Sequence, residues 1–186
     1  MTERRGLLAR LLPDPPRPPD DAGSGFAAYD LRSAWRRGDA GIEADAVAFW
    51  NRLAILPRGV RPEERARDLV AVAYRDGRAV GVATASFARI EALRGRFAAL
   101  RCAVDPDHRR ERIAAALTIL SRDLIEAWSA DHPEERVLGL AGVVAGPDLA
   151  AREREPVWPA TRLNLVGYSP EGRQIRVAWF AHARLD

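Results

Sequence analysis

Arginine side chains gather where an apolar stretch of the sequence gives way to an amphipathic one. The segment Leu100–Ala114 loses its apolar character at Pro106 and then carries Arg109, Arg110 and Arg112. The first turn of a helix has backbone N–H groups without partners and the positive end of the helix dipole, so it can bind phosphate. Arginines around such a turn add bidentate donors. The sequence therefore predicts a site for a phosphorylated cofactor, with a solvated run of charge as the alternative interpretation.

Other residues with catalytic or metal-binding chemistry are few and scattered. Three histidines, His108, His132 and His182, and the single Cys102 show no spacing typical of metal ligands. No nucleophile and base of the serine or cysteine hydrolase type are paired in the sequence. His108 could contact phosphate, although an exposed loop histidine is the simpler interpretation. We therefore predict no metal site.

The elements that position these residues follow from turn residues and apolar periodicity. Asp76 and Gly77 form a favoured two-residue hairpin turn between two apolar runs. A long helix is indicated by one apolar stripe at helical spacing, which we expect to face the core. The residues of this stripe are Ile113, Leu117, Leu120, Leu124 and Trp128.

The order of the predicted elements defines the expected fold class. They are a strand at 26–35, helices at 45–56 and 62–67, strands at 69–74, 78–87 and 97–104, a helix at 109–130, a strand at 137–145, a weak helix at 147–155, and a hairpin with arms at 163–168 and 174–181. This order predicts a mixed α/β fold with a mostly antiparallel central sheet flanked by helices.

Length and composition bound the domain organisation. A chain of 186 residues is long enough for one domain with a sizeable core. Residues 1–25 include a proline-rich stretch that cannot bury apolar area. We therefore expect a flexible tail and linker at 1–25 and a folded domain at 26–186.

Charge, cysteine content and the length of apolar stretches narrow the expected partners and cellular compartment. The formal net charge is +3, but every basic residue is arginine and none is lysine, which is typical of a GC-rich genome and is weak evidence for a nucleic-acid partner. The single cysteine excludes an internal disulfide framework and suits a reducing compartment. No apolar stretch reaches the roughly 18 residues needed to cross a membrane. We expect a cytoplasmic protein with no membrane partner.

The sequence from about residue 26 to the C-terminus resembles the GCN5-related N-acetyltransferase (GNAT) superfamily. Val104 begins a Val-Asp-Pro sequence where the family has Val-x-Pro, and Arg109–Ala114 aligns with the family's loop Arg/Gln-x-x-Gly-x-Gly/Ala, which holds the pyrophosphate of acetyl-CoA. Arg109 and Ala114 match that pattern, whereas Arg112 stands at its middle glycine. The hairpin at 74–81 also resembles the family's second and third strands. The resemblance implies an acyl-CoA N-acyltransferase fold with acetyl-CoA as co-substrate.

Arginine in place of glycine at Arg112 leaves two outcomes open. A glycine would let the backbone approach the phosphates without a Cβ, while an arginine backbone in a helical conformation would be unstrained. Arg109, Arg110 and Arg112 could together clamp the pyrophosphate. Alternatively, the Arg112 side chain blocks the loop, and the fold survives as a non-catalytic domain. We expect the first outcome.

The resemblance also implies contacts along the cofactor. In the family, the strand backbone at the positions of Cys102 and Val104 pairs with the pantetheine arm much as an added strand would. The thiol of Cys102 itself is interpreted as a small buried filler. The implied cofactor-binding residues are Cys102, Val104, Arg109, Arg110, Arg112, Ile113 and Ala114.

A general base and an acid for the leaving thiolate are harder to place. The family often has a tyrosine acid in the short helix after its fifth strand, but residues 147–155 contain no tyrosine, serine or cysteine. Tyr168 on the following strand is the fallback, with a core tyrosine at a strand end as the alternative. Glu91 could act as base, directly or through a water, if it faces the cleft; a solvated carboxylate is the alternative. Glu91 and Tyr168 are the predicted catalytic residues.

Three functions remain open from the sequence. The first is an acyl-CoA-dependent N-acyltransferase that transfers an acyl group, with acetyl-CoA as donor, to a primary amine of a small molecule or peptide. The second is a catalytically silent domain of the same fold that binds a CoA-type ligand or a protein partner. The third is an arginine-rich nucleic-acid-binding module. The apolar C-terminal hairpin could support a homodimer or complete the sheet of the monomer.

Overall fold

The computed structural model describes residues 29–109, 112–144 and 154–185. Its strands form one eight-stranded sheet in the order β1-β2-β3-β4-β5-β8-β7-β6. The strands are β1 Asp30–Ser33, β2 Leu69–Arg75, β3 Arg78–Ile90, β4 Gly95–Val104, β5 Val137–Val143, β6 Val157–Trp158, β7 Leu163–Tyr168 and β8 Gln174–Trp179. The α-helices are α1 Ala40–Leu53, α2 Pro62–Ala66 and α3 Ile113–Asp131. The 3₁₀ turns are η3 Glu91–Leu93, η4 Pro106–His108 and η5 Pro133–Glu135.

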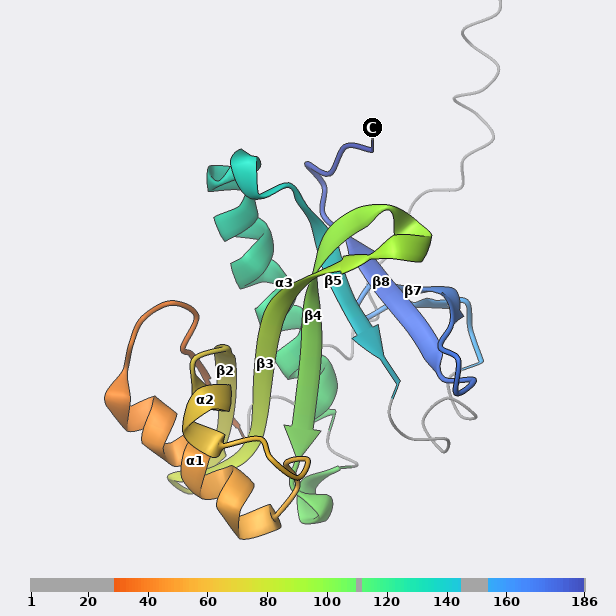
Figure 1. Cartoon of the computed structure of the whole chain (residues 1–186). Helices are drawn as coiled ribbons and strands as arrows, with labels where there is room; N and C mark the ends of the chain where they lie inside the picture. The colour runs from red at the N-terminus through yellow and green to blue at the C-terminus, as the bar shows by residue number, and fades with distance from the viewer. Residues whose placement is uncertain (1–28, 110–111, 145–153, 186) are drawn as a thin grey trace, which may run out of the picture.

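The sheet is antiparallel at every pair of described neighbouring strands except β4 and β5, which run parallel. Helices α1 and α2 lie on one face of the sheet and α3 lies on the other (Figure 1). The predicted class, a mixed and mostly antiparallel sheet flanked by helices, is confirmed.

The hairpin between β2 and β3 forms as the sequence predicts. Asp76 and Gly77 have φ values of 50° and 75°, the left-handed pair that a two-residue hairpin turn requires. Helix α2 and strands β7 and β8 also lie close to their predicted positions.

Helix α1 begins earlier than predicted because of a cap that the apolar pattern does not reveal. The side chain of Asp39 accepts hydrogen bonds from the backbone N–H groups of Gly41 and Ile42, at 3.0 and 3.1 Å. Such a cap satisfies donors that a helix start leaves open. The helix also ends before Pro57, since Ala54 adopts a left-handed conformation with φ 49°. The predicted bounds of 45–56 are therefore wrong at both ends.

Each face of the sheet buries its own apolar cluster. Under α1, Phe49 and Trp50 pack with Val72 and Val82, all of them buried. Under α3, the cluster combines helix residues with small sheet residues, so the helix can approach the strands closely. This second cluster includes Ala71, Ala73, Val80, Ala83, Ile113 and Leu117.

The predicted apolar stripe of the long helix is buried only in part. Ile113 and Leu117 are buried, whereas Leu120, Leu124 and Trp128 are half-buried. Ile125, which lies outside the stripe, is fully buried against the sheet. The helix thus turns a wider face to the core than the five-residue stripe suggests.

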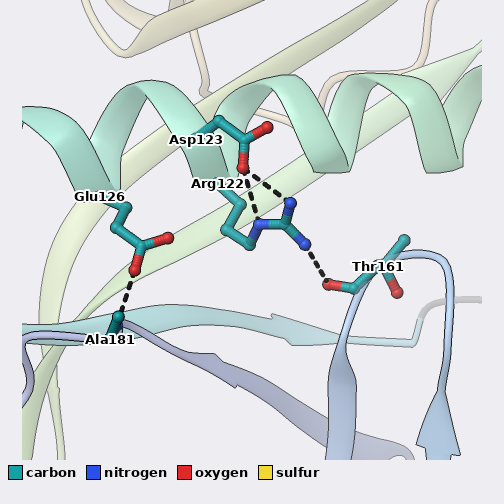
Figure 2. Close-up of polar contacts among 5 residues, drawn as sticks. All are labelled: Arg122, Asp123, Glu126, Thr161 and Ala181. Carbon is teal, nitrogen blue, oxygen red and sulfur yellow. Dashed lines mark hydrogen bonds and ion pairs between the residues drawn. The ribbon is translucent and has the colours of Figure 1, made fainter. Parts of the chain in front are cut away.

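Polar contacts fasten α3 to the C-terminal part of the sheet (Figure 2). The Arg122 guanidinium forms an ion pair with Asp123 and donates to the carbonyl oxygen of Thr161 at 3.3 Å. Glu126 accepts a hydrogen bond of 2.6 Å from the backbone N–H of Ala181. One helix therefore contacts the segments before β7 and after β8 as well as the strands beneath it.

Several predicted elements differ from the structure or lie outside the part that it describes. The first strand is shorter than 26–35, and β6 was not predicted. The long helix begins at Ile113 rather than at 109, because Arg112 directly before it has a left-handed backbone. The predicted tail and linker at 1–25 lie outside the described residues. So do residues 147–153 of the weak helix predicted at 147–155, and the remaining two residues of that prediction are not helical.

Candidate functional site

The strands β4 and β5 pair for only part of their length. Their parallel register links Arg96 to Val137, Ala98 to Leu140 and, last, Ala99 to Ala141. Beyond Ala99, β4 continues to Val104 while paired on its other side to β3. The two strands diverge toward their C-terminal ends (Figure 1). The C-terminal half of β4 therefore has one edge that β5 does not cover.

The backbone groups on this uncovered edge can be assigned by alternation. The N–H of Asp105 donates to the carbonyl oxygen of Val80 on β3 at 2.9 Å. Successive residues of a strand direct their N–H and C=O groups to opposite edges, and the β3–β4 register has no irregularity. The backbone groups of Cys102 and Val104 consequently face away from β3, toward the diverging β5. They can pair with an extended, amide-bearing group as an added strand would.

Helix α3 begins close to the end of this strand because a glycine lets it approach. Gly81 pairs with Val104 across β3 and β4. A Cβ atom on Gly81 would lie 3.0 Å from Cγ2 of Ile113 and 3.1 Å from Cδ1 of Leu117. An alanine here would require the side chains of Ile113 and Leu117 to shift, so the glycine allows the first turns of α3 to pack closely on the sheet.

The first turn of α3 has free backbone donors. Its first helical hydrogen bond runs from the N–H of Ala116 to the carbonyl oxygen of Arg112, and no side chain caps the helix. The N–H groups of Ile113, Ala114 and Ala115 precede that bond, so they have no partner within the helix. Ile113 is buried, while Ala114 is exposed. This turn can hold the oxygens of a phosphate group.

Arg112 adopts a left-handed backbone conformation, with φ 57° and ψ 14°. The helical conformation expected for it is therefore wrong. An L-residue in this region costs roughly 1–2 kcal/mol, and glycine is the residue that adopts it without penalty. The structure thus gives a second physical reason, beyond close approach, for a glycine at this position.

Arg109 and Arg112 lie between the end of β4 and the start of α3, and both are exposed. No hydrogen bond or ion pair occupies either guanidinium within the described ranges of the chain. Arg110 lies outside those ranges. The structure therefore brings together six predicted binding residues at one end of β4 and the start of α3. They are Cys102, Val104, Arg109, Arg112, Ile113 and Ala114.

An ion pair that the sequence did not predict holds the turn after β4. Asp105 is buried, and its Oδ2 lies 2.5 Å from Nη1 of Arg52 on α1. Arg52 also donates to the carbonyl oxygen of Ala79 at 2.9 Å, and Oδ1 of Asp105 accepts from the N–H of Asp107 at 3.2 Å. The hydrogen bond from Arg52 lowers the pKa of the Asp105 carboxyl. The aspartate before a proline marks a turn in the sequence, but nothing in the sequence links it to Arg52.

His108 is not the exposed loop histidine that was expected. It is half-buried, and its Nδ1 lies 3.3 Å from the hydroxyl of Tyr29, with the two rings edge to face. Arg75 donates to the same hydroxyl at 3.2 Å. This histidine therefore helps to fix the turn η4 against the start of the described chain.

Cys102 differs from the buried filler that was expected, because the residue as a whole is exposed. Its Sγ lies on the α3 side of β4, 3.8 Å from Oγ1 of Thr118. Surrounding protein atoms at the sulfur raise the pKa of the thiol to about 11. The group is thus a neutral thiol at physiological pH rather than a nucleophilic thiolate.

The structure does not bring Glu91 to this site. The residue lies in η3, beyond the pair Ile90 and Gly95, whereas the site lies at the opposite end of the hairpin, by Gly81 and Val104. The nine intervening steps along β4 span about 30 Å. The Glu91 side chain is 81% exposed and forms an ion pair of 3.1 Å with Arg89.

Tyr168 lies at the end of the sheet where β4 and β5 diverge, but on β7 rather than on either of these strands. It pairs with Gln174 on β8, and the carbonyl oxygen of Gln174 accepts from the N–H of Val144, just past β5. Strand β8 therefore separates Tyr168 from β5. The tyrosine is 62% exposed, so the alternative of a core tyrosine is wrong, and the hydroxyl is accessible.

The described residues hold no group of three or more histidine, cysteine, aspartate or glutamate side chains that could bind a metal ion. No helix in the described part of the chain is long and apolar enough to cross a membrane.

Similarity to known proteins is found by comparing structures and not by comparing sequences. No family model matches the sequence, and neither does any curated protein. Among solved structures, a GNAT-family acetyltransferase from Streptococcus pneumoniae aligns with a TM-score of 0.52 at 13% identity, over 82% of this chain and 99% of that one. The ribosomal-protein-S5-alanine acetyltransferase of Vibrio fischeri aligns with a TM-score of 0.55 at 9% identity, over 86% and 97% of the two chains.

A third solved structure is that of a Salmonella typhimurium protein with its cofactor acetyl-CoA. It aligns with a TM-score of 0.53 at 13% identity, covering 86% of this chain and 98% of that one. Identities this low carry the fold and not the activity. Together with the diverging β4 and β5 and the helix that starts beside them, these alignments over most of the chain show that the protein has the fold of the GNAT acetyltransferases.

Proposed function

We propose that the protein is an acyl-CoA-dependent N-acyltransferase that uses acetyl-CoA and acylates a primary amine. The observation that carries this proposal is the uncovered edge of β4, which ends beside the uncapped first turn of α3. Acetyl-CoA joins an extended arm with amide groups to a pyrophosphate. The arm matches the uncovered edge of β4, and the pyrophosphate matches the first turn of α3.

The residues at the site divide into two groups by the part of the donor that each would hold. Backbone groups of Cys102 and Val104 would orient the pantetheine arm. The N–H groups at the start of α3 would bind phosphate oxygens, and the guanidinium groups of Arg109 and Arg112 would add bidentate, charge-assisted donors.

The chemistry at the diverging strands is then direct acyl transfer. Acetyl-CoA supplies an activated thioester when it is bound. The amine nitrogen of the acceptor attacks the carbonyl carbon, the C–N bond forms as the C–S bond breaks, and the proton lost by nitrogen balances the thiolate to give the CoA thiol. Tyr168 remains our proposal for the acid that protonates the thiolate, because it lies at this end of the sheet. Glu91 has no part in this proposal, since it lies at the opposite end.

A specific observation favours a second candidate, a catalytically silent domain that binds a CoA-type ligand. Neither Glu91 nor Tyr168 lies on β4 or β5, and the buried carboxylate nearest the end of β4, Asp105, is held by Arg52. The two candidates share the same ligand site and differ in turnover.

Thermal unfolding with and without acetyl-CoA tests the shared site. A ligand at 100 times its dissociation constant adds about 2.7 kcal/mol to the free energy of unfolding. We expect a clear rise in the melting temperature for the wild type and none for Arg109→Glu. An unchanged melting temperature at millimolar acetyl-CoA, and with other acyl-CoAs, would overturn both candidates. Release of CoA thiol across a broad amine panel then separates them, because only the acyltransferase releases thiol.

A further inference from the structure

A basic pocket lies at the N-terminal end of β2. Strand β2 begins at Leu69, opposite Thr84, whereas its neighbour β3 continues to Ile90. The N–H of Ala85 donates to the carbonyl oxygen of Asp68 at 2.9 Å, and the next residues of β3 have no described strand on that side. A pocket of about 290 Å³ occupies this place. Its lining includes Trp35, Arg36, Arg67, Asp68, Ser86 and Phe87.

Positive charge is in excess around this pocket. The guanidinium of Arg36 lies over the rings of Trp35 and Trp128, at 5.3 and 4.2 Å from the ring centres. Neither Arg36 nor Arg67 has a carboxylate partner within the residues that the structure describes. Asp68 supplies the one carboxylate of the lining, and Arg65 lies 4.0 Å from it.

A further arginine, on β4, contacts a residue that lines the pocket. Nη1 of Arg101 lies 3.4 Å from Oγ of Ser86, and Arg101 has no ion pair with any described carboxylate. Cys102 contacts α3, so alternation along β4 directs Arg101 to the opposite face, where α1 and α2 lie. Two guanidinium groups and one carboxylate thus line the pocket, and the guanidinium groups of Arg65 and Arg101 lie next to Asp68 and Ser86 of its lining, an arrangement that attracts an anion.

Strands β3 and β4 separate the pocket from the point where β4 and β5 diverge. Ser86 pairs with Ala99, and Ala99 is the last residue of β4 that pairs with β5. Neighbouring strands are about 5 Å apart. Two strand spacings, about 10 Å, therefore separate the pocket from the diverging strands, and an extended molecule of about that length can have one end at each.

We propose that this pocket binds the anionic group, a carboxylate or a phosphate, of an acceptor whose primary amine lies about 10 Å away. The proposal rests on the acyltransferase function above and narrows it to acid-bearing amines with an extended chain between the two groups, such as long ω-amino acids or long-chain aminoalkyl phosphates. Arginine donates two parallel hydrogen bonds to either anion.

Matched pairs of amines test the acceptor class. Each amino acid is compared with its carboxamide, and each aminoalkyl phosphate with the corresponding amino alcohol, by the rate of CoA thiol release. We expect kcat/KM for the anionic member to exceed that of its neutral partner about tenfold or more. Amino acids and phosphates give separate results, which identify the anion. Equal values within every pair would overturn the anion pocket while leaving the acyltransferase in place.

Variants test whether the pocket carries this preference. Arg67→Gln and Arg101→Gln should each lower kcat/KM for the anionic amine about tenfold and leave that for the neutral partner unchanged. Arg184→Gln is the matched control, because this exposed arginine near the C-terminus contacts only its neighbour Ala183. An equal loss for both amines, or the same loss in the control, would contradict the assignment.

Equilibrium binding keeps the proposal testable if no thiol release is found. Each amine of a pair is titrated separately into the protein in the presence of desulfo-CoA, which cannot transfer an acyl group. Binding is followed by tryptophan fluorescence, because Trp35 lines the pocket. Tighter binding of the anionic member that is lost in Arg67→Gln would uphold the pocket, and a lack of turnover would then overturn only the acyltransferase. Equal binding of both members would overturn the pocket.

Discussion

Arg52 and Asp105 join the helix α1 to the end of β4, with Nη1 of the arginine 2.5 Å from Oδ2 of the aspartate. The arginine side chain is 27% exposed and the aspartate side chain 10%. The pair lies immediately before the turn that leads to Arg109 and α3, and it also ties in the start of β3 through Ala79. One ion pair thus fixes the turn between the two features of the candidate acyl-CoA site.

Removing the charge of Asp105 should destabilise the fold. Asp105→Asn leaves the Arg52 guanidinium without its anion in a partly buried place, so we expect the free energy of unfolding to fall by about 2 kcal/mol. Denaturant unfolding measures this change. Asp30→Asn is the control, because the pair of Asp30 with Arg32 is largely exposed and such pairs contribute little. Equal effects of the two substitutions would contradict a structural role for Asp105.

The same pair predicts the direction of a pH dependence. Because the pKa of Asp105 is lowered in the folded state, its contribution is complete above the unfolded value of about 3.9. That contribution is lost as the pH falls below this value toward the folded pKa. Denaturant unfolding between pH 2.5 and 6 should therefore show a smaller loss of stability on acidification for Asp105→Asn than for the wild type. Parallel curves would show that Asp105 is not the group concerned.

The left-handed backbone of Arg112 predicts that two small substitutions there differ in their effect on stability. Arg112→Gly relieves the strain of φ 57°, whereas Arg112→Ala keeps a Cβ in the same conformation. The glycine variant should be more stable than the alanine variant by about 1 kcal/mol, as measured by thermal unfolding. Equal stability would indicate that the chain does not hold this conformation in solution.

Binding of acetyl-CoA to these variants decides what the Arg112 side chain does. If the guanidinium contacts the pyrophosphate, both variants lose affinity about tenfold, and the loss shrinks at high salt. We expect this result. Tighter binding by both variants would instead show that the side chain blocks the phosphate site, which is the alternative left open by the sequence.

Gly139 in β5, the strand that diverges from β4, leaves no room for a side chain against β8. A Cβ atom on Gly139 would lie 2.5 Å from the carbonyl oxygen of Ala178 on β8, which has no flexible end that could move away. Gly139→Ala should therefore lower the free energy of unfolding by about 2 kcal/mol or more. Gly167→Ala on β7 is the matched control, since nothing lies within 4 Å of its added Cβ, and it should cost little.

The local parts of the fold were predictable because short sequence patterns determine them. The Asp76-Gly77 turn, the helix α2 that starts at Pro62 and the arms of the C-terminal hairpin need only neighbouring residues. The motif of Val104 and Arg109–Ala114 located the candidate site through its resemblance to a known family. Ends of elements were less accurate, as at Asp39, where a side-chain cap rather than apolar periodicity sets the start of a helix.

Relationships between distant residues were beyond the sequence. The contact of Arg52 with Asp105 spans 53 positions, and no periodicity links the two. Glu91 was placed at the site because it ends a strand, yet the length of the β3–β4 hairpin carries it to the opposite end of the sheet. The left-handed conformation of Arg112 was missed because the helix was expected to begin earlier. The first two of these depend on where residues lie in three dimensions, which helix packing and strand register determine, whereas the third is a local backbone conformation.

Amide hydrogen exchange with and without acetyl-CoA tests the proposed site most directly, residue by residue. If the pantetheine arm pairs with the uncovered edge of β4 and the phosphates bind the first turn of α3, the N–H groups of Cys102, Val104 and Ala114 become protected when acetyl-CoA is added. Amides of β7, such as that of Gly167, should not change and serve as the internal control. Unchanged exchange at these three amides under saturating acetyl-CoA, or protection confined to another part of the sheet, would contradict the acyl-CoA site.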